Sequence, residues 1–213
     1  MIAYQPRFLV HRSSILLVAL WVIACSQRSE PETSSDKKQM NQMAFEVQRE
    51  RLGDSLGSQR CGVSMFAPRD WKPLAPEMLE QMRSRIAALT HDTAAFRLQP
   101  EYVFAKQQTG VSLTLSRVLF RDTTLSGSVR LQHYTASLLA ANPDTNTVKT
   151  AAFLKGDIPI TQVFLRHEQQ IAYKLLFLNA RNEILQLDYV LPLQVFEAEI
   201  KAVESSIGSI ALR

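Results

Sequence analysis

The pattern of apolar and polar positions divides the chain into three parts. An apolar run covers residues 15–23, a polar stretch follows residue 25, and regular spacing begins near residue 60. Alternation with a period of two predicts half-buried strands, which cover residues 62–68, 101–106, 111–120, 148–154, 158–166, 171–178 and 184–191. Apolar residues three and four apart predict helices over residues 76–89, 126–141 and 192–210.

The predicted order of elements is β-α-β-β-α-β-β-β-β-α. Short turns join consecutive strands at Thr109-Gly110 and at residues 155–157 and 179–182. Because parallel neighbours need a long crossover, these turns indicate antiparallel hairpins. In the last pair, alternate residues of 171–177 face alternate residues of 185–189 as candidate core positions. The sequence therefore predicts a single α+β domain in which helices pack a twisted, mostly antiparallel sheet.

The first 24 residues have the organisation of a signal peptide. Arg7 and Arg12 precede the apolar run, and no acidic residue occurs before Cys25. The run is too short to cross a bilayer, which takes roughly 20 apolar residues as a helix. We therefore expect residues 1–24 to be a leader rather than a permanent membrane span.

The end of this leader, Val22-Ile23-Ala24-Cys25, resembles the lipobox of bacterial lipoproteins, with Val22 and Ala24 as permitted variants of the usual leucine and glycine. The resemblance implies that Cys25 is acylated, that cleavage follows Ala24, and that palmitate and related acyl chains hold the protein on a membrane. Ser26 replaces the aspartate that retains some lipoproteins at the inner membrane, which favours the periplasmic face of the outer membrane in the cell envelope. The alternative is an ordinary secretory signal with an incidental cysteine.

The stretch that follows the leader predicts a tether. Residues 29–38 are polar and charged and cannot repay the entropy of ordering, so we expect residues 25–59 to be flexible. Met40, Met43, Ala44 and Val47 share one helical stripe, which allows a short amphipathic helix over residues 36–51, docked on the domain, on lipid or on a partner. The folded domain is expected to cover residues 60–213.

Charge and cysteine content narrow the classes of function. The chain has 24 basic and 20 acidic residues, and two of the basic ones lie in the leader, so the mature protein is close to neutral. Its basic pairs, such as Arg83 and Arg85, are scattered and are interpreted as solvated surface, which gives no support to nucleic-acid binding. If Cys25 is acylated, Cys61 has no intramolecular partner, and a buried small hydrophobe is favoured over a reactive thiol.

The order of elements, together with a few short segments, resembles the PsbP-like superfamily. The segments are residues 66–71 at the end of the first strand, Tyr173-Lys174-Leu175, Leu187-Asp188-Tyr189, and Phe196, Ile200, Ser206 and Ile207 in the final helix. The resemblance covers residues 60–213. It implies a sandwich of sheet and helices and a role as a binding or scaffolding module, and it carries over no catalytic residue.

The sequence contains no signature of a catalytic, metal or cofactor site. The segment His167-Glu168-Gln169-Gln170-Ile171 begins like a zinc-binding helix, but Ile171 stands where the second histidine is needed. Serine-hydrolase, phosphate-loop and dinucleotide glycine patterns are missing. The sequence leaves open a catalytic triad of residues that are far apart along the chain, because such residues meet only in the fold. The candidates are His91, His133, His167 and the aspartates at 70, 92, 157 and 188. We therefore expect a protein that is not an enzyme.

Three residues are candidates for partner binding. Trp71 follows a strand end, where it either caps the core or contributes to a binding surface. Arg117 and Arg121 flank an apolar strand end, where they either meet an acidic partner or protect an edge strand. Two functions are therefore expected as alternatives. The first is a lipid-anchored accessory module for an envelope protein complex. The second is a small-molecule or lipid-binding domain, or a cryptic hydrolase, with a pocket between sheet and helices.

Overall fold

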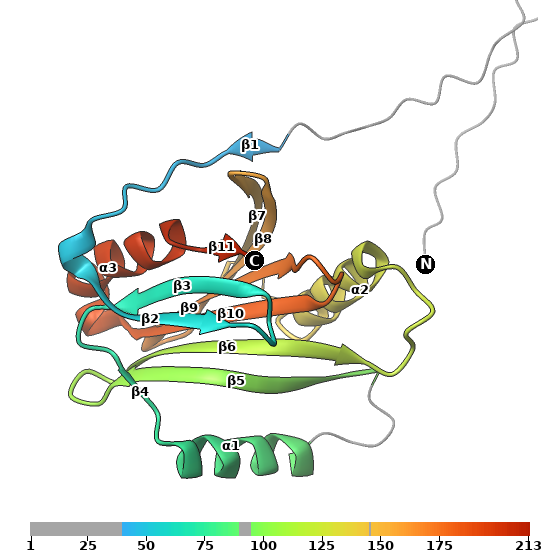
Figure 1. The fold of residues 1–213 in the computed structure, drawn as a ribbon, viewed down its shortest axis with the longest axis horizontal. Coiled ribbons are helices and arrows are strands. Elements are labelled where there is room, and N and C mark those ends of the chain that lie inside the picture. The colour runs from blue at the N-terminus through green and yellow to red at the C-terminus, as the bar shows by residue number, and fades with distance from the viewer. Residues whose placement is uncertain (1–39, 90–94, 145) are drawn as a thin grey trace, which may run out of the picture. The chain divides into compact units, whose positions relative to one another are not determined.

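The computed structural model describes residues 40–89, 95–144 and 146–213 (Figure 1). The predicted leader, Ala24 and Cys25 lie outside these residues. The larger of two sheets has eight strands in the order β1-β7-β8-β9-β10-β6-β5-β4. Its strands are β1 (Asn41–Gln42), β4 (Lys72–Pro73), β5 (Phe96–Lys106), β6 (Val111–Phe120), β7 (Val148–Lys155), β8 (Ile158–Arg166), β9 (Gln170–Leu178) and β10 (Ile184–Pro192).

A smaller sheet and three helices complete the described part of the chain. The second sheet has the order β11-β3-β2 and contains β2 (Leu52–Ser58), β3 (Val63–Pro68) and β11 (Ala211–Leu212). The helices are α1 (Pro76–Leu89), α2 (Gly127–Ala140) and α3 (Phe196–Gly208), with short 3-10 turns η1 (Arg49–Arg51) and η2 (Leu193–Val195). Within the described residues, no helix is long and apolar enough to span a membrane.

The predicted fold class is confirmed, and the predicted elements occur in the predicted order, although the pattern did not indicate β1, β2, β4 or β11. The last helix begins at Phe196 and not at Pro192, because Pro192 is the final residue of β10. All described strand pairs are antiparallel except β1 with β7. The last pair has the expected facing residues, because Phe177 pairs with Leu185 and Leu175 with Leu187. The predicted turns are also present, and Gly110 adopts a positive φ of 71° between β5 and β6, a conformation that glycine tolerates without strain.

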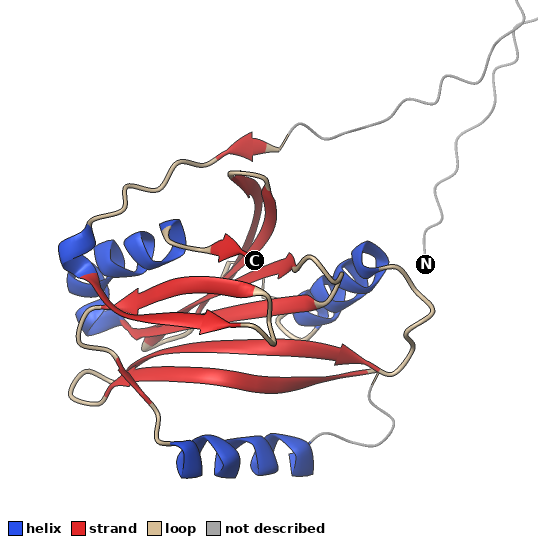
Figure 2. Cartoon of the chain, in the orientation of Figure 1, coloured by secondary structure: helices blue, strands red, loops and turns tan. Residues whose placement is uncertain are grey.

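Alternation along the strands of the large sheet creates two apolar cores. Leu185, Leu187 and Tyr189 of β10 point into the core shared with the small sheet and α3. Ile184 points to the other face, where Tyr134 of α2 is fully buried. Figure 2 shows the small sheet and α3 grouped together, with α2 elsewhere along the large sheet and α1 beside β5. Each face of the large sheet is therefore covered by different elements.

The region before residue 60 differs from the prediction. In place of a helix over residues 36–51, the described residues 40–51 contain β1, an extended segment and η1. A Cβ atom on Gly208 would lie 2.7 Å from Val47 Cγ2 and 2.8 Å from Phe45 Cβ, so glycine lets this segment lie directly on α3. Strand β2 then pairs with β3. Folded structure therefore begins before Arg60, because these tertiary contacts outweigh a weak helical pattern.

Candidate functional site

A bulge in β5 places a carboxylate inside the protein. The pairing of β5 with β6 shifts register between Pro100 and Tyr102 and leaves Glu101 as the extra residue. Pro100 has no N–H to donate to the ladder, and proline inside a strand commonly marks a bulge. Bulges redirect side chains and are frequent beside functional sites. Glu101 is the result here, with a side chain that is only 5% exposed.

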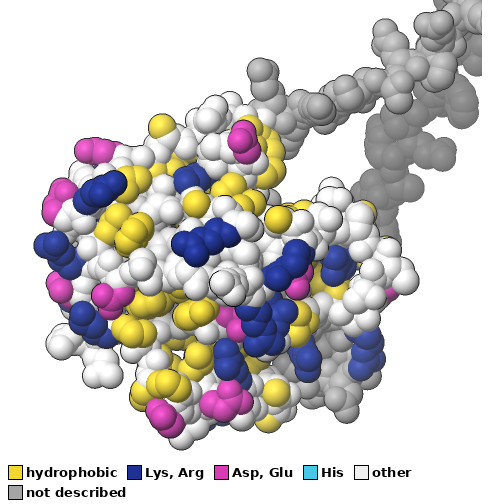
Figure 3. All heavy atoms as spheres, in the orientation of Figure 1, with side chains coloured by type: hydrophobic (Ala, Val, Ile, Leu, Met, Phe, Trp, Pro, Cys, Tyr) yellow, Lys and Arg dark blue, Asp and Glu magenta, His cyan; other side chains and the backbone are white. Residues whose placement is uncertain are grey.

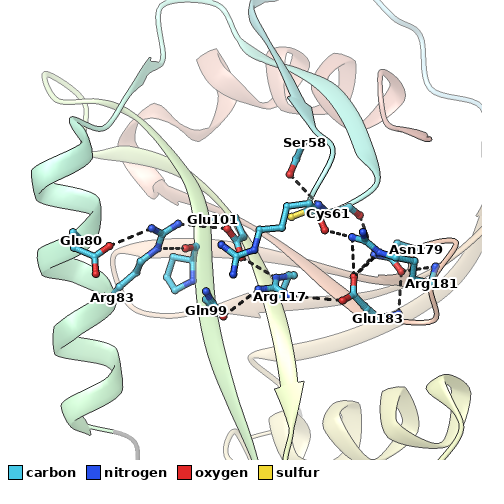
Figure 4. A network of polar contacts seen from close by, with 12 residues as sticks. Ser58, Cys61, Glu80, Arg83, Gln99, Glu101, Arg117, Asn179, Arg181 and Glu183 are labelled. Carbon is cyan, nitrogen blue, oxygen red and sulfur yellow. Dashed lines mark hydrogen bonds and ion pairs between the residues drawn. The ribbon is translucent and has the colours of Figure 1, made fainter. Parts of the chain in front are cut away.

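Three arginines from three separate elements surround Glu101 (Figure 4). Arg117 of β6 places Nε 2.8 Å from Oε1, and Arg83 of α1 places Nη2 3.4 Å from Oε2. Arg60, in the turn between β2 and β3, has its Nε 3.6 Å from Oε1. A buried carboxylate is costly unless cations and hydrogen bonds compensate it, and these guanidinium groups supply both.

A second carboxylate, Glu183, extends the network to the turn between β9 and β10. Its oxygens lie 3.6 Å from Nη1 of Arg117 and 3.1 Å from Nη2 of Arg181. The Asn179 side chain donates to Glu183 at 2.7 Å and to the Cys61 carbonyl at 3.0 Å. Asn179 Oδ1 also accepts from the backbone N–H groups of Arg181 and Glu183. These bonds join the β9–β10 turn to the β2–β3 turn.

We name Arg60, Arg83, Arg117 and Arg181 the arginine cluster. Two of its cations lie at the surface, because the side chains of Arg60 and Arg181 are 60% and 53% exposed. Arg117 is 12% exposed and lies deeper, beside the buried Glu101. In Figure 3, Lys and Arg side chains gather over β5 and β6 near the β2–β3 turn. The arrangement presents guanidinium groups whose orientation is already set, and such groups bind carboxylates or phosphates through paired hydrogen bonds.

The cluster contains no activated nucleophile. Cys61 is fully buried, and desolvation raises the pKa of its thiol, which opposes formation of the reactive thiolate. The prediction of a buried small residue is therefore confirmed. His133 in α2 and His167 after β8 are both exposed, and His91 lies outside the described residues. No group of three metal-binding side chains occurs in the described part of the chain.

The three residues predicted to bind a partner have different environments in the structure. Trp71 is 1% exposed and donates its indole N–H to Glu199 at 3.1 Å, so it belongs to the core and not to a surface. Arg117 enters the cluster. Its strand β6 lies between β5 and β10, so the alternative of a protected edge strand is wrong. Arg121 lies beyond the end of β6 at the surface, where its backbone N–H donates to Ala95.

Sequence reasoning missed most of the cluster. The scattered basic pairs predict that Arg83 is solvated, yet its Nε donates to the Pro100 carbonyl at 2.7 Å and its Nη2 contacts Glu101. Arg60 and Arg181 belong to turns that are far apart along the chain. The only available signal was a proline followed by a glutamate at the start of a predicted strand, which could have indicated a bulge.

The structure also contains two hollows relevant to the predicted pocket. One, about 620 Å³, lies between α2, the sheet and Met40, and its lining is mostly apolar and has no charged side chain. The other, about 270 Å³, lies between α1 and β5 and includes Arg83 and Arg97. Neither hollow contains a histidine or a cysteine in its lining, so neither gathers the groups that a cryptic hydrolase of the predicted kind would need.

No family model and no curated protein matches the chain. A solved structure does. The fold is similar to that of cyanobacterial PsbP (CyanoP) from Synechocystis sp. PCC 6803, determined in solution. The two chains are 8% identical, the match covers 76% of this chain and 94% of CyanoP, and the TM-score is 0.44. The likeness concerns the path of the backbone.

Proposed function

We propose that the protein is a non-catalytic accessory module of the bacterial cell envelope that binds an acidic segment of an envelope protein through the arginine cluster. The observation that carries the proposal is that two exposed guanidinium groups, those of Arg60 and Arg181, are held by the buried Glu101 and the half-buried Glu183. Glu101 and Glu183 hold the arginines in position, so a partner meets a surface that loses little side-chain freedom on binding.

Electrostatics determine which partner such a surface selects. Carboxylates on the partner would accept hydrogen bonds from Arg60 and Arg181, which are more than half exposed. Complementary charge mainly increases the rate of association and the specificity, and salt screens it over about 10 Å at 0.1 M ionic strength. The complex should therefore weaken as the salt concentration rises.

The same proposal includes the lipid anchor. Acyl chains on Cys25 hold the chain on a membrane, with the periplasmic face of the outer membrane favoured. An extended chain from Cys25 to Met40 reaches at most roughly 50 Å, so in this proposal Met40 lies within that distance of the bilayer. Incorporation of labelled palmitate tests the anchor: we expect the wild-type chain to be labelled and Cys25→Ser not to be. Equal labelling of both would contradict it.

Partner binding is tested by recovering the full-length, acylated protein from gently solubilised native membranes. The Arg60→Glu, Arg181→Glu double variant reverses two exposed charges of the cluster. The Arg69→Glu, Lys72→Glu double variant is the matched control, because both residues are exposed and lie outside the network. We expect mass spectrometry to find a protein partner that the first variant loses and the control keeps.

Three outcomes would contradict the proposal. Recovery of the same partner by both double variants would exclude the arginine cluster as the binding surface. Loss of the partner in both would indicate a non-specific charge effect. A lipid or small molecule recovered without any protein would favour the pocket beside α2 and the alternative function predicted from the sequence.

A further inference from the structure

A third hollow, about 530 Å³ in volume, lies where β4, the beginning of α1 and the turn between β5 and β6 meet. Figure 1 shows these three elements at one end of the large sheet. The volume falls within the roughly 300–1,000 Å³ that is typical of small-molecule sites. Every residue of the lining is described, and none of them belongs to the arginine cluster.

The segments that the structure does not describe adjoin other parts of the domain. The described chain begins at Met40 beside β1, and β1 and β4 form opposite edges of the large sheet. With neighbouring strands about 4.8 Å apart, these edges are separated by roughly 34 Å along the sheet. Residues 90–94 follow the last residue of α1, whereas Met78 of the lining lies in its first turn, roughly 16 Å away along the helix. The described residues therefore define the shape of this hollow.

Lys106, the last residue of β5, is a positioned cation in the lining. Its Nζ donates to Oε1 of Glu199 at 2.7 Å, and Oε2 of Glu199 accepts the indole N–H of Trp71 at 3.1 Å. Both oxygens of this buried carboxylate therefore have a donor. A lysine ammonium carries three N–H groups, so Lys106 keeps two that Glu199 does not use. Because its side chain is 28% exposed, these two donors are available to a bound molecule.

The other polar residues of the lining indicate the head group of such a molecule. Gln107 and Gln108, in the β5–β6 turn, add side-chain amides that donate and accept hydrogen bonds. Asp70 and Lys72 carry opposite charges and balance each other. A charged donor forms its strongest hydrogen bonds with a charged acceptor, so the unused N–H groups of Lys106 favour a carboxylate.

One wall of the hollow is apolar. Leu74 and Ala75 precede α1, and Met78 lies in its first turn. Met78 is 49% exposed, the largest value among the exposed large apolar side chains of the described residues. Its flexible thioether adapts to ligands of different shapes, and covering it removes apolar surface from water. The site therefore combines a positioned ammonium with an apolar wall, as small-molecule sites commonly do.

We propose that this hollow binds a small, water-soluble organic carboxylate with an apolar body. The carboxylate accepts hydrogen bonds from Lys106, and the apolar body lies against Met78 and Leu74. Glu199 holds the Lys106 ammonium in place before binding, so little side-chain freedom is lost there. The site differs from the arginine cluster in position and in ligand, and it does not depend on the proposed function.

The probe is hydrocinnamate, titrated by calorimetry into the full-length protein. Three comparison compounds each change one property: hydrocinnamamide is uncharged, phenylpropylammonium is a cation, and acetate has almost no apolar body. We expect hydrocinnamate to bind, the amide to bind about tenfold more weakly, and the cation and acetate not to bind measurably. In a Trp21→Phe background Trp71 is the single tryptophan. Its fluorescence should change on binding, because Glu199 joins it to Lys106.

A first pair of variants tests the ammonium. Lys106→Met keeps the length of the side chain and removes its charge. Lys174→Met is the matched control, because Lys174 also lies 2.7 Å from a carboxylate, that of Asp188, and is 20% exposed. We expect Lys106→Met to weaken hydrocinnamate binding about tenfold and Lys174→Met to leave it unchanged.

A second pair tests the apolar wall without disturbing the core. Met78→Glu places a carboxylate at the hollow, in the first turn of a helix, where an acidic side chain is favourable. Met43→Glu is the control, because Met43 is 42% exposed and lies outside the lining. We expect Met78→Glu to lose hydrocinnamate and to bind phenylpropylammonium instead. A merely destabilised fold would not produce this exchange of ligands.

The proposal fails if the full-length protein does not bind hydrocinnamate, or if the amide binds as tightly as the acid. Equal binding of acetate would show a general effect of anions. Normal binding by Lys106→Met, or the same behaviour of Met78→Glu and Met43→Glu, would place the ligand elsewhere and would also overturn the proposal. Recovery of a partner through Arg60 and Arg181 is a separate measurement, so either proposal can fail alone.

Discussion

Two buried glutamates, Glu101 and Glu199, have different surroundings. Glu199 of α3 accepts a hydrogen bond from Trp71 at 3.1 Å and contacts Lys106 at 2.7 Å. Trp71 is itself buried against Tyr189, with ring centroids 6.3 Å apart. Glu101 contacts three arginines, one of which is more than half exposed.

The difference lies in how many donors each carboxylate gathers. The Lys106 ammonium and the Trp71 indole together carry four N–H donors, and Glu199 accepts one from each. Each guanidinium carries five N–H donors, so three arginines offer more than one carboxylate accepts. A buried carboxylate held by a core indole and one lysine serves stability, whereas one that orients several arginines, two of them exposed in the same network, can also serve recognition of a protein partner.

The largest expected effect concerns Glu101. Glu101→Ala leaves Arg117 and Arg83 beside each other without their shared carboxylate, and removing one partner of a buried pair costs about 3–5 kcal/mol. We expect the free energy of unfolding in urea to fall by about 3 kcal/mol. Glu80→Ala is the control, because Glu80 is 68% exposed and contacts only the outer side of Arg83. Similar stability of both variants would show that the network does not hold the fold.

A smaller effect is expected at Glu199. Trp71→Phe removes the indole N–H and leaves a buried oxygen of Glu199 without its donor, at a cost of about 1–3 kcal/mol. Urea unfolding measures this loss. Partner recovery from native membranes should be unchanged, because Trp71 does not reach the surface. Loss of the partner in a folded Trp71→Phe protein would remove the distinction between the two glutamates.

The smallest effect concerns Cys61, whose carbonyl closes the network through Asn179. Desolvation raises the pKa of its thiol above the usual 9.0. The folded state then holds this proton more tightly than the unfolded state, so the thiol's contribution to stability is complete below pH 9.0 and is lost as pH rises through the folded pKa. Wild-type protein should therefore lose stability faster than Cys61→Ala above that pH. Parallel pH curves would contradict the burial of the thiol.

The fold was largely predictable because its signals are local. The alternation in residues 111–120 and the four- and three-residue spacing in the last helix act within single elements. The strand has the predicted bounds, and the helix covers Phe196–Gly208 of the predicted 192–210. Short turns made the pairing of β9 with β10 predictable, because neighbours joined by a few residues have little choice of partner. Residues 40–51 were not predictable from local signals. Their path depends on contacts with Gly208 of α3 and Leu154 of β7, which are far away along the chain.

By itself, the sequence determined the α+β class, the order of elements, the antiparallel pairing and the burial of Cys61, because periodicity and turn length act between neighbours. Only the tertiary structure decided that Trp71 is internal and that Arg60, Arg83 and Arg117 meet at Glu101. These residues come from a turn, a helix and two strands, and the bulge after Pro100 aims the carboxylate at all three. A charged side chain in a sequence carries no mark of its distant partners, because Coulombic and hydrogen-bond contacts depend on positions in space.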